Sequence, residues 1–165
     1  MATTYEAIAT ITVGSGGAAS IDFTSIPQTY TDLQLLVCAR DNDGGITSGC
    51  GITFNGTAWS GNIELYRSGS TVGSGTTGGE TIASGNGATA STFGNASVYI
   101  PNYTGSNSKV ISADGVGENN ATASISQLLA GNSGVTAAIT SLSITPGGTL
   151  FLQYSTATLY GIKNS

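Results

Sequence analysis

The residues of this 165-residue chain whose types could support chemistry are nine carboxylates and two cysteines. Histidine does not occur, so the usual general base, the Ser-His-Asp and Cys-His arrangements and the commonest metal ligand are missing. Two carboxylates about 5–9.5 Å apart could still hydrolyse a glycosidic bond. Only Asp41 and Asp43 are close in sequence, and their Gly-rich surroundings are typical of a solvated turn. The sequence therefore predicts no catalytic residue and a protein that is not an enzyme.

The run Asp41-Asn42-Asp43-Gly44 resembles the opening of a calcium-binding loop. An EF-hand places a bidentate Glu where this chain has Ile52, so the match to that loop fails. An irregular calcium site at Asp41 and Asp43 stays open as an alternative to a turn stabilised by Asp and Asn side chains. We expect no cofactor and no resident metal.

The two cysteines lie symmetrically about Gly44. If the strands around Cys38 and Cys50 form a hairpin, the two side chains face each other at a distance that suits a disulfide. Synthesis in a reducing cytoplasm favours the other state, in which both are buried free thiols that act as small apolar residues.

The elements that must position these residues are strands. Short runs of β-branched and aromatic residues recur between clusters of Gly, Asn, Ser and Pro, the pattern of an antiparallel sandwich or barrel. We expect strands at 6–13, 19–24, 32–40, 50–54, 58–66, 93–100, 109–113, 121–129, 138–144 and 150–162. Period-two alternation, for example at Ile63 and Leu65, predicts one dry face that packs on a core. The expected fold class is therefore all-β, a two-sheet antiparallel sandwich of jelly-roll type.

One strand differs from the others because apolar residues occupy both of its faces. The run is Leu33-Gln34-Leu35-Leu36-Val37-Cys38-Ala39, and a strand of this composition needs cover on both sides. The second cover is either a partner subunit or a loop of the same chain. The first alternative makes Leu33, Leu35 and Val37 candidate subunit-interface residues.

Asn55-Gly56 is the strongest local signal, because both residues tolerate the positive φ of a two-residue type I′ hairpin turn. In the resulting register Phe54 faces Thr57 and Ile52 faces Trp59. We therefore expect Cys50, Ile52, Phe54 and Trp59 on the core side of one sheet.

A Gly/Ser/Thr-rich tract from about 68 to 91 contains almost no large apolar residue. It predicts a long surface loop on a single domain that spans residues 1–165. The loop is either an arm that orders against a neighbour or receptor, or an excursion without a partner.

Charge and hydropathy exclude several classes of protein. Charged residues make up 8% of the chain, the net charge is −5, and four cations could not neutralise a run of phosphates, so nucleic-acid binding is not expected. No apolar run approaches the roughly 20 residues of a membrane-spanning helix, and the start Met1–Glu6 lacks the features of a secretory signal. We expect synthesis in a cytoplasm and no membrane partner.

Three segments resemble small structural proteins of marine and cyanobacterial tailed phages. They are Ser20–Leu35 (SIDFTSIPQTYTDLQL), Ala137–Ile144 (AAITSLSI) followed by a Gly turn and a final strand, and Leu159–Lys163 (LYGIK). The resemblance implies a jelly-roll sandwich that serves in a virion, as a decoration or cement protein of the capsid or as part of a fibre or tail. It does not imply catalysis.

The leading hypothesis is a capsid decoration or cement protein on the virion exterior, with the major capsid protein and copies of itself as partners. A homo-oligomer is expected, and a trimer would suit three-fold capsid positions. The alternative is a tail or head fibre, or a receptor-binding module, in which Trp59, Tyr66 or Tyr103 would stack on host glycans.

Overall fold

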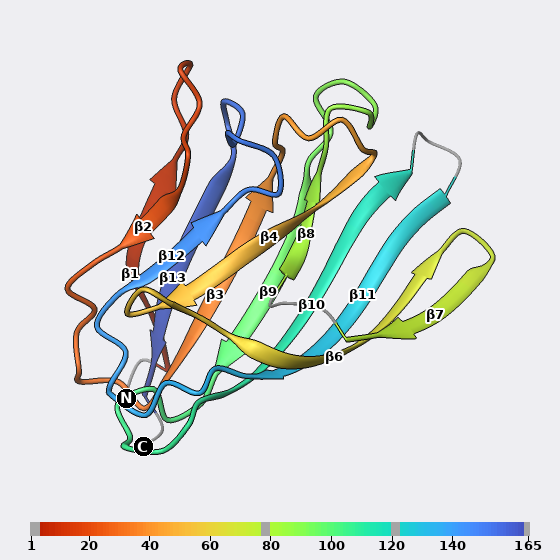
Figure 1. Ribbon diagram of the computed structural model, residues 1–165. Coiled ribbons are helices and arrows are strands. Elements are labelled where there is room, and N and C mark those ends of the chain that lie inside the picture. Colours follow the sequence, from red (N-terminus) through yellow and green to blue (C-terminus); the bar gives the residue numbers. More distant parts are fainter. Residues whose placement is uncertain (1–3, 77–79, 120–122, 164–165) are drawn as a thin grey trace.

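The computed structural model describes residues 4–76, 80–119 and 123–163 (Figure 1). Over these ranges the chain consists of strands, turns and loops, and no helix there has the length and apolar character needed to cross a membrane. Two antiparallel sheets face each other as a sandwich. The prediction of an all-β, two-sheet antiparallel sandwich is confirmed.

The larger sheet has eight strands and the smaller has five. In spatial order the larger sheet contains β1 (Tyr5–Thr12), β13 (Thr156–Ile162), β3 (Asp32–Ala39), β9 (Gly94–Ile100), β10 (Val110–Asn119), β11 (Ala123–Asn132), β6 (Ser60–Ser68) and β7 (Thr71–Gly75). The smaller sheet contains β2 (Ile21–Phe23), β12 (Leu142–Thr145), β4 (Thr47–Phe54) and β5 (Thr57–Ala58), with β8 (Glu80–Ser84) paired to β4.

The core lies between the two sheets and is built by period-two alternation, because every second side chain of a strand points to the same face. β3 contributes Leu33, Leu35 and Val37, which belong to the same apolar cluster as the side chains of the smaller sheet. The largest fully buried side chains of this cluster are Trp59, Tyr103, Phe54, Phe151, Ile21, Leu33, Leu35, Ile52, Ile100, Ile139, Leu142 and Ile144.

The turn between β4 and β5 is the one that the Asn-Gly pair predicts. Asn55 and Gly56 have φ values of 50° and 76°, and Phe54 pairs with Thr57. Cys50, Ile52, Phe54 and Trp59 are all buried, as expected for the core side. The Trp59 ring meets the Phe54 ring edge-on, with centroids 6.4 Å apart.

The tract expected as a long surface loop at 68–91 contains two strands, β7 and β8. Each has only one large apolar residue. They form strands nevertheless, because main-chain hydrogen bonds pair β7 with β6 and β8 with β4. In β7, Gly73 and Gly75 leave room for neighbouring side chains, since a Cβ at Gly73 would overlap the Tyr66 ring. The loop prediction is therefore wrong for 71–75 and for 80–84.

Candidate functional site

The outer face of the eight-stranded sheet, the face that points away from the smaller sheet, carries the main candidate site. On β6 the side chains of Ile63, Leu65 and Arg67 point to this face, while Glu64 and Tyr66 point to the inner one. The prediction that Ile63 and Leu65 face a core is wrong, since their exposed fractions are 65% and 57%. β6 alternates as expected, but its apolar side chains point away from the core.

Strand register brings further apolar side chains beside these two. Leu65 pairs with Leu128 of β11, and Leu128 pairs with Asp114 of β10. Leu128 is 62% exposed. Other exposed aliphatic residues on the same face are Leu36, Val72, Val110 and Val116. A single isolated apolar side chain on a surface is ordinary, but a contiguous set on one sheet face marks an interaction site.

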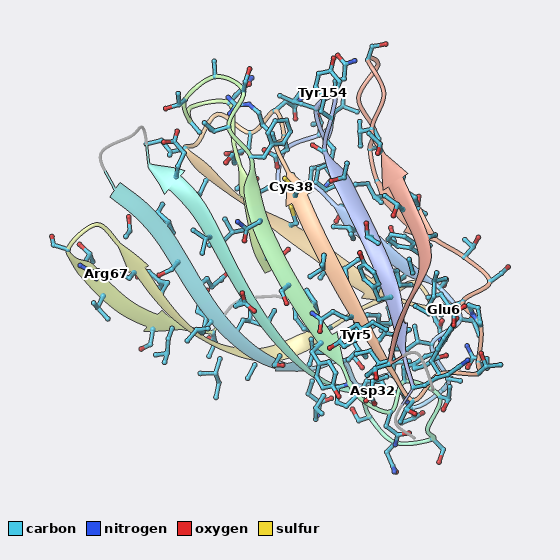
Figure 2. The ribbon with its side chains drawn as sticks, turned by 180° about the vertical axis from the view of Figure 1, so that it is seen from behind. Tyr5, Glu6, Asp32, Cys38, Arg67 and Tyr154 are labelled. Carbon is cyan, nitrogen blue, oxygen red and sulfur yellow. The ribbon has the colours of Figure 1, made fainter. Side chains whose placement is uncertain are left out.

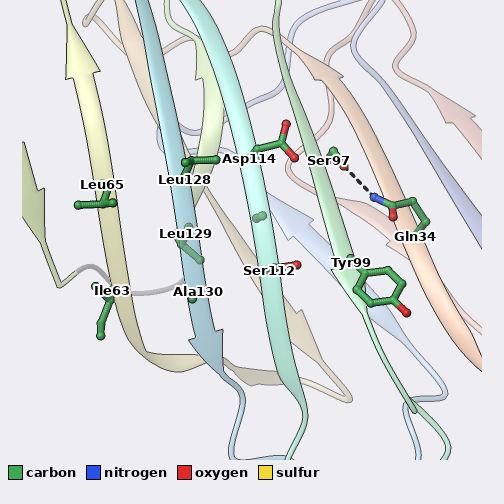
Figure 3. A pocket seen from close by; sticks show the side chains of 11 residues that line it. Gln34, Ile63, Leu65, Ser97, Tyr99, Ser112, Asp114, Leu128, Leu129 and Ala130 are labelled. Atoms are coloured by element: carbon green, nitrogen blue, oxygen red, sulfur yellow. Dashed lines mark hydrogen bonds between the residues drawn. The ribbon is translucent and has the colours of Figure 1, made fainter. Parts of the chain in front are cut away.

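Ile63, Leu65 and Leu128 border a shallow groove of about 540 Å³, which we call the aliphatic groove (Figure 3). Ile63, Leu65 and Leu128 form one wall, and Gln34 and Tyr99 lie on the other side. The residues between them are small, namely Ser97, Ser112 and Ala130. A depression forms here because small residues on β9, β10 and β11 stand between two rows of larger ones.

The wall formed by Gln34 and Tyr99 is fixed by hydrogen bonds. The Gln34 amide donates to Ser97 Oγ at 2.8 Å, which is the dashed line in Figure 3. The Tyr99 hydroxyl donates to the buried Asp32 carboxylate at 2.8 Å. This hydrogen bond, together with partial burial and the Asp32 charge, raises the pKa of Tyr99. The polar wall is therefore held in place before any partner binds.

The outer face carries charges of both signs. Asp114 lies at one end of the aliphatic groove, and Arg67 lies two residues beyond Leu65 on β6 (Figures 2 and 3). Arg67 Nε donates to the carbonyl of Gly69, which is the hydrogen bond that fixes its side chain locally. A face with both a cation and an anion can complement a second copy of itself.

The structure corrects the interface residues expected from the sequence. Leu33 and Leu35 are fully buried and Val37 is nearly so, all within the core of the same chain. They cannot contact another subunit because the smaller sheet already covers them. Leu36 is the apolar residue of this stretch that points outward, and it is exposed. β3 therefore presents an apolar side chain on the outer face, but at an even-numbered position instead of the odd-numbered ones expected.

Asp41 and Asp43 occupy different environments. The Asp41 carboxylate is buried and accepts hydrogen bonds from Ser48 Oγ at 2.6 Å and from the backbone N–H groups of Asp43, Gly147 and Gly148 at 3.1–3.3 Å. Asp43 accepts from the Gly45 N–H at 2.8 Å. Both carboxylates thus fasten the turn at 41–48, as turn-forming Asp residues do. Across the described ranges no three His, Cys, Asp or Glu side chains gather where a metal ion could be held. The absence of a resident metal stays a prediction, with a calcium site at Asp41 and Asp43 as its untested alternative.

The two cysteines form no disulfide with each other and lie in different sheets. Cys38 is exposed on the outer face of β3 (Figure 2), whereas Cys50 is buried in the core on β4. The hairpin that would have brought them together does not form, because β3 and β4 belong to opposite layers. The expectation of two buried thiols is correct for Cys50 alone.

Among the aromatic residues considered for glycan stacking, Trp59 and Tyr103 are buried in the core. Tyr66 keeps part of its ring exposed on the inner face of β6. No family model, curated protein or solved structure matches the chain.

Proposed function

We propose that the chain is a structural subunit of the exterior of a tailed-phage virion, a capsid decoration or cement protein that assembles through its outer face. The observation that carries the proposal is the aliphatic surface on the outer face of the eight-stranded sheet, with Ile63, Leu65 and Leu128 each more than half exposed. The low charge of the chain and its resemblance to phage structural proteins support the same assignment.

The outer face is large enough for a stable interface. Eight strands at about 4.8 Å spacing, each of about eight residues at about 3.3 Å per residue, span roughly 38 Å by 26 Å, or about 1,000 Å². A standard protein interface buries about 800 Å² on each partner. Burial of apolar surface at about 25 cal/mol per Å² supplies the driving force.

The occupant of this face that we propose is a second copy of the chain. Opposite charges on one face allow Arg67 of each copy to approach Asp114 of the other, which is how an isologous two-fold contact becomes self-complementary. Two sheets packed face to face at about 30° place their aliphatic side chains in a common layer about 10 Å thick. This geometry favours a dimeric unit over the trimer expected from the sequence.

Cryo-EM of the virion that contains the chain tests its location. The expected result is density for the sandwich on the outside of the capsid, with outer faces of neighbouring copies in contact. Density confined to the tail or fibre would reject the decoration role, and absence of the chain from purified particles would reject the virion assignment.

A further inference from the structure

A second, polar pocket of about 270 Å³ lies on the inner side of β6, between β4 and β8 of the smaller sheet and β6 and β11 of the larger one. Its walls include Ser48, Glu64, Tyr66, Thr81 and Gln127. The volume is slightly below the roughly 300–1,000 Å³ of pockets for drug-sized ligands, so the pocket admits a compact ligand of about one ring.

Glu64 is the charged group of this pocket, and it is only 9% exposed. The Gln127 side-chain amide donates to Glu64 Oε2. The cations Arg40, Lys109 and Lys163 are engaged elsewhere, with loop carbonyls or with Glu6. A buried carboxylate is costly unless hydrogen-bond donors surround it, so Glu64 gains from a ligand that brings O–H donors.

Tyr66 supplies an apolar surface beside these polar groups. Its ring lies against Gly73 of β7, where any side chain would overlap it, and Gly75 leaves similar room for Glu64. The absence of a Cβ at both positions seats the two side chains at the pocket. One aromatic face beside a carboxylate and an amide group suits a ring with C–H groups on its face and hydroxyls at its edge.

We propose that this pocket binds a neutral saccharide through one sugar ring, which stacks on Tyr66 and whose hydroxyls bond to Glu64 and Gln127. An anionic sugar or phosphate is disfavoured because the charged side chain that lines the pocket is a carboxylate. A quaternary ammonium group has no hydrogen-bonding atom to offer Glu64 or Gln127. The site does not rest on the virion assignment, and it uses the face of β6 opposite to the aliphatic groove.

Saturation-transfer NMR tests the proposal with the methyl glycosides of glucose, galactose, mannose and N-acetylglucosamine. Each is used at about 10 mM, because a one-ring ligand in a small site is expected to bind in the millimolar range. Choline chloride serves as the cationic probe. The expected result is saturation transfer to at least one glycoside and none to choline.

Two variants test the residues. Tyr66→Ala and Glu64→Gln are each expected to weaken glycoside binding about tenfold or more. Glu64→Gln keeps the size and shape of the side chain, so it tests the carboxylate even if Tyr66→Ala fails to fold.

Tyr154→Ser is the control, since Tyr154 is an exposed tyrosine that lines neither this pocket nor the aliphatic groove, and it should leave glycoside binding unchanged. The proposal is overturned if no glycoside shows saturation transfer, if choline alone does, or if Glu64→Gln binds the glycoside as the unaltered chain does.

Discussion

Glu64 and Leu65 are neighbours in β6, yet the carboxylate is the buried side chain and the leucine the exposed one. The polar residue is buried and the apolar one exposed because of where β6 lies. It extends the larger sheet beyond the smaller one, and its inner face borders the polar pocket. A buried carboxylate beside an exposed leucine is unfavourable in an isolated chain. Both become favourable once each face has a partner.

Leu65→Asp is expected to prevent association through the outer face. The substitution places a charge in the aliphatic groove, and two copies that meet face to face would bury it without a partner. The isolated subunit should keep its free energy of unfolding within about 0.5 kcal/mol, since the side chain is exposed. Light scattering after size-exclusion chromatography should report a dimer for the unaltered chain and a monomer for the variant.

Tyr154→Asp is the control for this experiment, because Tyr154 is also an exposed large residue but lies in a loop at the end of the sandwich (Figure 2). It should leave the mass unchanged. A monomeric unaltered chain at every concentration would contradict face-to-face pairing.

Arg40→Met is expected to loosen the loop at 85–93. The Arg40 guanidinium is buried and donates to the carbonyls of Thr89, Thr92, Ala88 and Asn86 at 2.9–3.4 Å. Without the guanidinium, these four carbonyl groups lose their hydrogen-bond donor. We therefore expect a loss of about 3 kcal/mol in the free energy of unfolding. Urea denaturation measures the loss, and hydrogen exchange should rise within 85–93.

Arg67→Met provides the comparison, because Arg67 is exposed, and it should change stability by no more than about 0.5 kcal/mol. Equal changes in the free energy of unfolding for the two substitutions would show that the hydrogen bonds from Arg40 to the loop carbonyls do not stabilise the fold.

Tyr99→Phe is expected to change how stability depends on pH. The hydrogen bond to Asp32 raises the pKa of Tyr99 above that of an unfolded tyrosine, which is about 10. Its contribution is therefore fully present below about pH 10 and is lost as the pH rises through the raised folded value. The variant should be less stable by about 0.5–1 kcal/mol near pH 8, because the pair is partly solvated.

This stability difference should shrink as the pH rises above about 10, and urea denaturation of both proteins at increasing pH measures it. The pKa of Lys109 is lowered by burial, so its contribution to stability grows as the pH rises towards 10.5, but that contribution is common to both proteins and cancels. A gap that stays constant with pH would show that the Tyr99 hydrogen bond is not linked to titration.

Asn55→Ala is expected to cost about 2–3 kcal/mol. Asn55 has a φ of 50°, which alanine adopts at a cost, and its side-chain oxygen accepts from the N–H groups of Thr140 and Ser141 at 2.9 and 3.1 Å. Its amide also donates to the carbonyl of Ala138 at 2.9 Å. Thermal unfolding measures the loss. Gly56→Ala is the control, because it strains the same turn but breaks no side-chain hydrogen bond, and it should lose about half as much stability. Equal losses would contradict a role for the Asn55 side chain beyond the turn.

Local pattern and turn chemistry were sufficient to predict much of the fold. The Asn55-Gly56 turn, the core side of β4 and most strand positions follow from period two and from the φ preferences of Asn and Gly. β7 and β8 could not be predicted, because each carries only one large apolar residue and each is defined by main-chain pairing, β7 with the adjacent β6 and β8 with the more distant β4.

The candidate site was harder to predict, because alternation does not say which half of a strand points inward. The pairs Ile63/Leu65 and Glu64/Tyr66 have the same period, and only the position of β6 beyond the smaller sheet decides between them. The cysteine pair shows the same limit, since spacing about Gly44 suggested a hairpin while the strands on either side belong to opposite layers.

The reactivity of Cys38 is expected to depend on protein concentration. Cys38 is exposed on the outer face and Cys50 is buried, so one thiol of the folded chain should react with iodoacetamide and both after denaturation. Partial burial raises the pKa of the Cys38 thiol, so its alkylation should be slow near neutral pH and faster as the pH rises. If outer faces pair, dilution should accelerate alkylation of Cys38 because the dimer shields it. The Leu65→Asp variant should react at the fast rate at every concentration. A rate that is independent of concentration in the unaltered chain would mean that Cys38 lies outside any contact between copies.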